Sequence, residues 1–96
     1  MLKVAFRSSA DAQLVAAKGW YDQQRKGLGD EFARSLESVI NRVARNPFAA
    51  PVVYANVRRF YSNAFSYSVF YTTDANNLLV LSCLDTRRAT FDGSAS

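Results

Sequence analysis

The sequence contains no histidine and a single cysteine, Cys83. These absences exclude zinc sites of the usual His and Cys types, and they exclude Ser/His and Cys/His nucleophile arrangements. One cysteine cannot form an internal disulfide, which fits a reducing compartment. No apolar run approaches the roughly 20 residues of a membrane span, and residues 1–9 lack the apolar core of a signal peptide. We therefore expect a cytoplasmic protein that binds no membrane, no metal and no cofactor.

The chain has 96 residues, of which 49% are hydrophobic. This is the size of one small domain with a single core, so we expect one domain over residues 1–96 with a tail from about residue 91. Twelve basic and eight acidic residues give a net charge of +4, which favours acidic partners such as nucleic acid or an acidic protein. From Arg34 to Arg59 there are five arginines and one acid, Glu37, so the middle of the chain is its basic part.

A short strand over residues 2–6 and two helices are predicted in the first half of the chain. Apolar residues at helical spacing predict one helix over about residues 9–26, closed by Gly27. A second helix over about residues 30–45 ends before Pro47, because proline disfavours helical backbone at the residue before it. Its apolar stripe consists of Phe32, Leu36, Val39, Ile40 and Val43. The short link requires the helices to form an antiparallel hairpin.

Three further strands are predicted in the second half, over residues 57–61, 65–73 and 78–84, after a loop. The middle run alternates, with Phe65, Tyr67, Val69 and Tyr71 on one face. Turn residues 73–77 make the last two strands a hairpin. The order β-α-α-β-β-β predicts an α+β domain, with the N-terminal strand and helical hairpin packed on a small antiparallel sheet.

One face of this sheet raises the question of a partner. Residues 78–84 are apolar at both odd and even positions, so both faces of this strand are apolar. Phe70 places an aromatic ring on the otherwise polar face of its strand. The helices can cover only one face, so some apolar surface remains. Either a partner binds it, with Phe70 in the contact, or the C-terminal tail or a loop covers it.

Several motifs, taken together in this order, resemble the ParE/RelE family of toxins from bacterial type II toxin-antitoxin systems. They are "GLGDEF" between the helices, "NP" after the second helix, "VRRF", the alternating strand "FSYSVFY", and a final apolar strand followed by "RR". The similarity runs from about Phe6 to Thr90. It implies the fold predicted above and a small antitoxin partner that neutralises the toxin. ParE-like plasmid stabilisation proteins poison DNA gyrase without being enzymes, whereas RelE-like members are ribosome-dependent mRNA endonucleases.

The sequence departs from the family pattern at Asp85, where many relatives carry a histidine two residues before the arginine pair. An imidazole can transfer protons near neutral pH, but an ordinary aspartate is already ionised there and repels phosphate. Relatives often also have a proline at Ser66, a difference that a strand tolerates. The first departure argues against RNA cleavage.

Few residues can supply the chemistry of RNA cleavage, which needs a base, an acid and cations. Arginine fills only the cation role. The remaining catalytic candidates are Arg59, Tyr71 and Arg87, although Tyr67 and Tyr71 share the apolar face and a core role is favoured for both. Trp20 and Tyr21 could stack on bases, but their helical spacing favours the core of the helical hairpin.

Target or antitoxin binding is the favoured role for the arginines. Adjacent residues on a strand point to opposite faces, so Arg58 and Arg59 cannot form one clamp. The binding candidates are Arg58, Arg59, Phe70, Arg87 and Arg88. We expect a toxin that binds DNA gyrase and is neutralised by a cognate antitoxin. The alternatives are a ribosome-dependent mRNA endonuclease and an inactive binding protein with the toxin fold.

Overall fold

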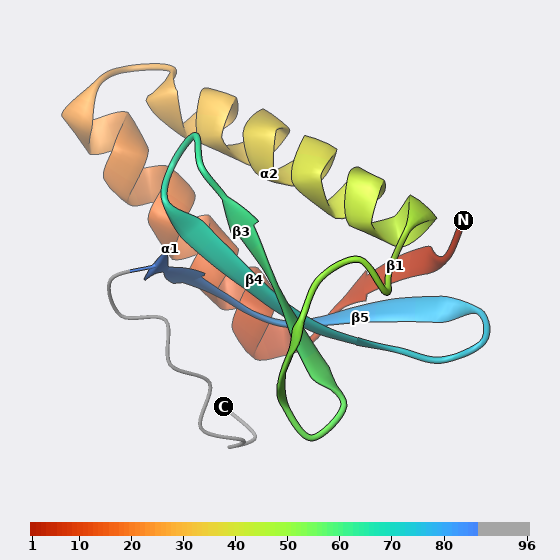
Figure 1. The fold of residues 1–96 in the computed structure, drawn as a ribbon. Coiled ribbons are helices and arrows are strands. Elements are labelled where there is room, and N and C mark those ends of the chain that lie inside the picture. The colour runs from red at the N-terminus through yellow and green to blue at the C-terminus, as the bar shows by residue number, and fades with distance from the viewer. Residues whose placement is uncertain (87–96) are drawn as a thin grey trace.

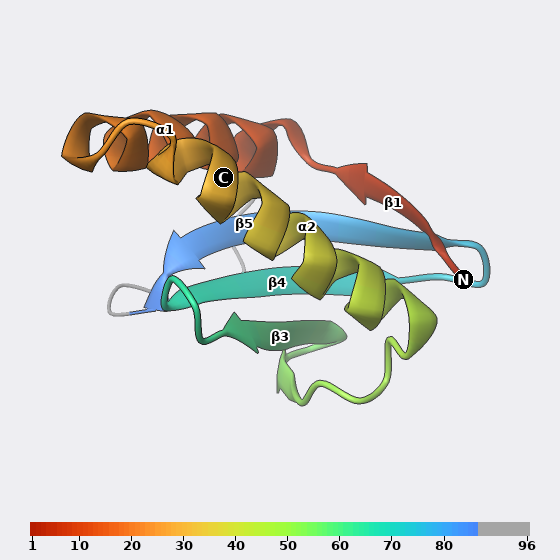
Figure 2. The same cartoon turned by 90° about the horizontal axis from the view of Figure 1, so that it is seen from above.

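The computed structural model of the chain describes residues 1–86. Its elements are β1 (Lys3–Phe6), α1 (Ser8–Gln24), α2 (Leu28–Arg45), β2 (Val52–Tyr54), β3 (Val57–Ser62), β4 (Tyr67–Thr73) and β5 (Asn77–Asp85). The two helices form a hairpin that lies on one face of a five-stranded sheet (Figures 1 and 2). The predicted α+β architecture is confirmed. Neither helix in the described part of the chain is long and apolar enough to cross a membrane.

The predicted antiparallel sheet is confirmed for β3, β4 and β5, and the N-terminal strand adds a parallel pairing at one edge, so the whole sheet is mixed. The strand order is β1-β5-β4-β3-β2, and β1 pairs with β5 in parallel, with Val4 opposite Leu78. The other three pairings are antiparallel. Parallel strands require a long connection, and here the two helices and strands β2, β3 and β4 connect β1 to β5.

Strand β2 lies inside the segment that was predicted to be a loop. Val52 pairs with Arg58 and Tyr54 pairs with Val57 across the two-residue turn Ala55–Asn56, with an irregularity between Val52 and Tyr54. Ala55 adopts a left-handed φ of 49°, which is unusual for a residue with a Cβ. The sequence carries no Asn-Gly or Asp-Gly signal there, and a conventional hairpin prediction depends on that signal.

The remaining boundaries differ from the predictions by a few residues. Helix α1 ends at Gln24, and Gly27, with φ of 87°, lies at the start of α2 instead of closing α1. Strand β4 begins at Tyr67, because Asn63–Ser66 form a turn in which Ser66 has a φ of 54°. The predicted end of the second helix at Arg45 is confirmed.

The main core lies between the helices and the sheet. The predicted stripe of α2 is buried there, together with Tyr67, Val69 and Tyr71 of β4. At one end of this core, rings of Tyr21, Phe32, Phe65 and Tyr67 pack with centroids 4.9–6.3 Å apart. Trp20 does not join them: its side chain is 56% exposed, so the expectation that it is a core residue is wrong. Trp20 only touches the edge of Tyr21, with centroids 5.1 Å apart.

A β-bulge explains why β5 has apolar residues at both odd and even positions. Phe70 pairs with Ser82 and Tyr71 pairs with Val80, so Leu81 is an extra residue in β5. Leu78, Val80 and Cys83 belong to the core under the helices. Leu81 instead joins Val57 and Phe70 in a second cluster, with Leu79 and Leu84 packed against it. Phe70 is 1% exposed, so the sheet is not open to a partner at this ring.

Candidate functional site

Two of the candidate residues, Arg58 and Tyr71, fasten the segment after α2 to the sheet. The Tyr71 hydroxyl donates a hydrogen bond of 2.6 Å to the Pro47 carbonyl oxygen. Arg58, opposite Tyr71 in the β3–β4 register, donates to the carbonyl oxygens of Ala50 at 2.6 Å and Phe48 at 3.3 Å. The Arg58 guanidinium also lies 5.1 Å from the centroid of the Phe48 ring. Both side chains are thus engaged with the protein's own backbone.

The environment of Tyr71 is unsuited to proton transfer. Its side chain is fully buried, and burial raises the pKa of the hydroxyl above its ordinary value, although the neighbouring Arg58 opposes this. A general base must be largely deprotonated near the operating pH and must reach the substrate. Tyr71 meets neither requirement in this structure.

Arg59 lies apart from Tyr71, on the opposite face of the sheet. Arg59 pairs with Phe70 across β3 and β4, so the two side chains lie on the same face of the sheet. The predicted separation of Arg58 and Arg59 is in agreement with this register. Arg59 lines an open hollow of about 370 Å³ together with Pro51, Tyr61 and Asn63. The structure therefore does not bring the catalytic candidates Arg59 and Tyr71 together.

Cys83 is inert in this fold. The thiol is free and buried, and burial raises its pKa to about 12. A reactive cysteine needs a lowered pKa and access to solvent. Within residues 1–86 there is also no group of His, Cys, Asp or Glu side chains that could hold a metal ion.

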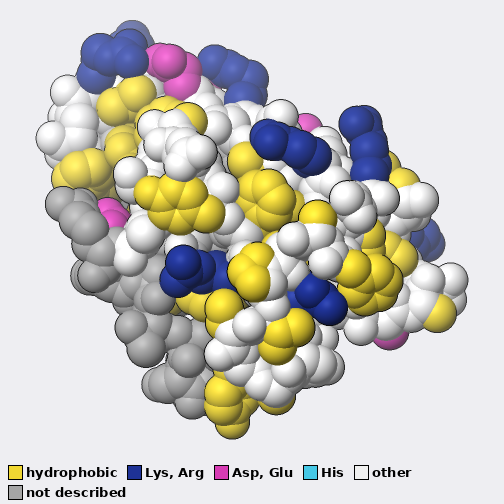
Figure 3. All heavy atoms as spheres, in the orientation of Figure 1, with side chains coloured by type: hydrophobic (Ala, Val, Ile, Leu, Met, Phe, Trp, Pro, Cys, Tyr) yellow, Lys and Arg dark blue, Asp and Glu magenta, His cyan; other side chains and the backbone are white. Residues whose placement is uncertain are grey.

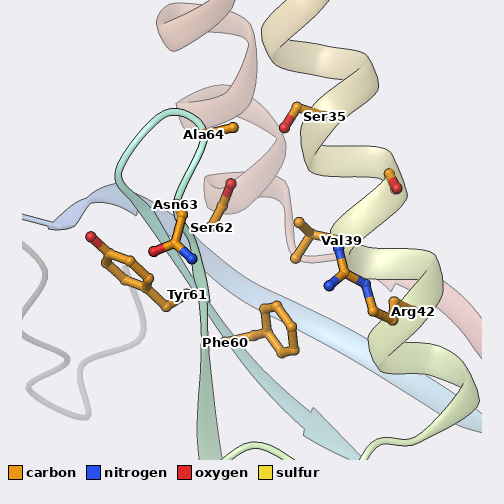
Figure 4. Close-up of a pocket in the computed structure, with 9 residues that line it drawn as sticks. Ser35, Val39, Arg42, Phe60, Tyr61, Ser62, Asn63 and Ala64 are labelled. Carbon is orange, nitrogen blue, oxygen red and sulfur yellow. The ribbon is translucent and has the colours of Figure 1, made fainter.

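A polar groove between α2 and β3 was not predicted. It has a volume of about 270 Å³, and Ser35, Val39 and Arg42 of α2 face Phe60 and Ser62 of β3 across it (Figure 4). The signal that could have revealed it is the spacing of Ser35, Ser38 and Arg42, which are three and seven residues apart and share one helix face.

An aromatic hollow lies at the other side of the β3–β4 turn. It measures about 380 Å³ and is lined by Trp20, Tyr21, Tyr61, Phe65, Ser66, Asp85 and Thr86. Trp20 and Tyr61 are 56% and 42% exposed, so this part of the surface presents rings to solvent. In the view of Figure 3, basic side chains alternate with apolar ones and few acidic ones are visible. Such a surface suits binding by stacking and by charge.

The binding candidates have different settings. Arg58 is held by carbonyl groups, Arg59 is partly exposed beside Tyr61, and Phe70 is buried. Arg87 and Arg88 lie outside the described residues. The binding role of all five stays a prediction.

The tether made by Tyr71 gives a direct stability test. We expect Tyr71→Phe to lower the free energy of unfolding by about 1 kcal/mol, since it removes one hydrogen bond and keeps the ring. Tyr61→Phe is the matched control, because its exposed ring makes no hydrogen bond within residues 1–86, and we expect less than about 0.5 kcal/mol. Urea unfolding of both variants measures the difference. Equal midpoints for the two variants would contradict a structural role for the Tyr71 hydroxyl.

A comparison with known proteins finds a solved structure with a similar fold. Neither a family model nor a curated protein sequence matches the chain. Among solved structures, the chain is similar to one described as "Chromosomal ParDE TA system from P. aeruginosa", with a TM-score of 0.76 and 13% sequence identity. The match covers 86% of this chain and 94% of that chain. The similarity extends over most of the chain and shows that the two chains share a fold. The order of elements agrees with the one that the motifs resembling the ParE/RelE family indicate.

Proposed function

We propose that this protein is the toxin of a type II toxin-antitoxin pair, that it inhibits growth by binding and poisoning DNA gyrase, and that a cognate antitoxin neutralises it. The ParE-like fold over 86% of the chain carries the proposal. The motifs "GLGDEF", "VRRF" and the arginine pair at residues 87–88 agree with it. The net charge of +4 suits an antitoxin with an acidic binding segment.

The gyrase mechanism is favoured over RNA cleavage because the candidate proton-transfer residue, Tyr71, is buried and lies apart from Arg59. The chain has no histidine, and the Tyr71 hydroxyl is buried against Pro47. Lys18 lies on α1 in an ion pair with Asp30, at an N–O distance of 3.1 Å. Arg59 can supply positive charge but cannot act as a base. Inhibition of gyrase by binding needs no proton-transfer group, only surface residues that contact the target.

The proposal is tested by inducing the protein in a bacterium and following DNA and mRNA together. We expect growth arrest, DNA damage signalling and, with purified gyrase and plasmid, accumulation of cleaved DNA. Co-expression of the small protein encoded beside it should restore growth. Rapid ribosome-associated mRNA cutting without DNA damage would instead identify an endonuclease. A protein that does not inhibit growth and still binds the neighbouring product would be an inactive binding partner with the toxin fold.

Arg87 and Arg88 are the residues whose replacement should separate toxicity from folding. We expect the double variant Arg87→Ala, Arg88→Ala to lose growth inhibition, because removing two charged contacts costs a few kcal/mol of binding. Its thermal unfolding should match that of the parent chain. The double variant Arg25→Ala, Lys26→Ala removes the same charge at the helical turn and should remain toxic. Full toxicity of the Arg87, Arg88 variant would place the target contact elsewhere.

A further inference from the structure

The groove between α2 and β3 presents hydrogen-bond donors without a carboxylate. Its lining consists of Ser35, Ser38, Val39, Arg42, Phe60, Tyr61, Ser62, Asn63 and Ala64. Serine hydroxyls therefore come from both walls, with an arginine on one wall and an amide at the end of the other (Figure 4). A groove with a positive charge, several donors and no carboxylate favours an anion over a cation.

The main donors of the groove are not used by the described part of the protein. Arg42 makes no ion pair or hydrogen bond within residues 1–86, in contrast to Arg58, which binds two carbonyl oxygens. Its guanidinium carbon lies 5.8 Å from the centroid of the Phe60 ring. The ring therefore supports one face of the guanidinium and leaves its N–H groups available.

Ser62 supplies the second unusual observation. The residue is only 4% exposed, and no residue from 1 to 86 hydrogen-bonds its hydroxyl. Within residues 1–86 the Ser9 hydroxyl is the one side-chain polar atom that is both sealed from solvent and without a partner, so the Ser62 hydroxyl still reaches the groove. The Ser62 side chain lies between β3 and α2 in Figure 4, so a ligand in the groove can accept a hydrogen bond from this hydroxyl.

We infer that this groove is a binding site for the phosphate group of a phosphate ester. A phosphate has tetrahedral oxygens that accept hydrogen bonds from several directions, and the donors of Ser35, Arg42 and Ser62 come from two opposite walls. A planar carboxylate instead suits the paired N–H groups of one arginine fork. The inference goes beyond the proposed function, because it does not depend on gyrase or on an antitoxin.

The surrounding charge favours the same ligand. Arg34 and Arg45 line an outer hollow on α2 that shares Ser38 with the groove, so two more positive charges lie nearby. Glu37 is the one acid among the residues that line these two hollows, and it lies on the outer side. Phe60 gives the groove an aromatic surface that can contact the organic part of the ester.

The test is a titration of the isotope-labelled full chain with inorganic phosphate, at constant ionic strength with chloride as the balancing anion. We expect saturable amide shifts at Ser35, Arg42 and Ser62. Arg42→Gln should weaken binding about tenfold, the effect of losing one charge-assisted contact. Arg34→Gln, which removes the same charge from the same helix outside the groove, should change binding less than about twofold. Arg42→Lys should retain part of the affinity, since it keeps the charge.

Two further titrations separate the possible sources of the phosphate. Stronger binding of an oligothymidylate than of adenosine monophosphate, lost in Arg42→Gln, identifies a nucleic-acid backbone as the source. Equal or stronger binding of the mononucleotide identifies a free nucleotide. The inference is overturned if none of the three phosphate probes shifts the groove resonances, or if Arg34→Gln weakens binding as much as Arg42→Gln. Unchanged amide spectra outside the groove verify that each variant is folded.

Discussion

Replacing Gly29 by alanine is expected to lower the free energy of unfolding by roughly 3 kcal/mol or more, the upper range of overpacking in a buried contact. Gly29 is buried in the first turn of α2, where this helix passes over α1. A Cβ at this position meets the Lys18 carbonyl oxygen and lies 2.7 Å from both Cγ and Oδ1 of Asp22. The backbone oxygen cannot rotate away, so α1 and α2 must separate.

Separation of the helices also removes a favourable contact. The Gly29 N–H donates a hydrogen bond of 2.7 Å to the Asp22 carboxylate. This bond satisfies one of the free N–H groups at the start of α2 and places a negative charge at the positive end of the helix. The alanine variant therefore loses a charge-assisted hydrogen bond in addition to gaining strain.

Gly19→Ala provides the matched control on the partner helix. Its added Cβ meets nothing within 4 Å. Alanine stabilises a helix interior by roughly 0.5–1 kcal/mol relative to glycine, so Gly19→Ala should raise the melting temperature. Gly29→Ala should lower it by about 12 °C or more, at about 4 °C per kcal/mol for a domain of this size. Calorimetry of both variants measures the shifts, and a rise in both would show that the helices tolerate a methyl group between them.

Alkaline pH should destabilise the protein through Cys83. In the folded chain burial holds the pKa of the thiol near 12, whereas its ordinary value is 9.0. Below pH 9 the thiol is protonated in both states, and this contribution to stability is fully present. Between pH 9 and 12 the unfolded chain releases the proton and the folded chain retains it, so stability falls as pH rises. The loss amounts to roughly 1 kcal/mol by pH 10 and roughly 3 kcal/mol by pH 11.

Cys83→Ala isolates this effect from the other groups that titrate in the same range. Tyr71 also has a raised pKa and loses stability in the same direction above pH 10, but it is present in both proteins. The variant should be less stable than the parent near pH 8, because a small cavity forms beside Leu78 and Val80. The two stability curves should converge between pH 9 and 11 in urea unfolding. Parallel curves would show that Cys83 is not buried as described.

The candidate site was only partly predictable from the residues. The spacing of Tyr71 in an alternating run indicates a core position, and its burial agrees. Its bond to Pro47 and the bonds of Arg58 to Phe48 and Ala50 join segments 8 to 24 residues apart, which no local pattern records. Helical spacing placed Trp20 in the core beside Tyr21, but in the fold Trp20 faces solvent and is 56% exposed.

The amino-acid sequence alone determines the local order of this protein. Helix α2 follows from its apolar stripe and ends before Asn46–Pro47, and strand β4 follows from its alternating pattern. Each of these signals lies within a few residues of the element that it specifies. The absence of histidine likewise limits the chemistry without any structure. Tertiary structure decides the parallel pairing of β1 with β5, the bulge at Leu81, the close contact at Gly29 and the groove that Arg42 and Ser62 line. Each of these depends on residues that are distant in the chain, and their free energies arise only when the helical hairpin packs on the sheet.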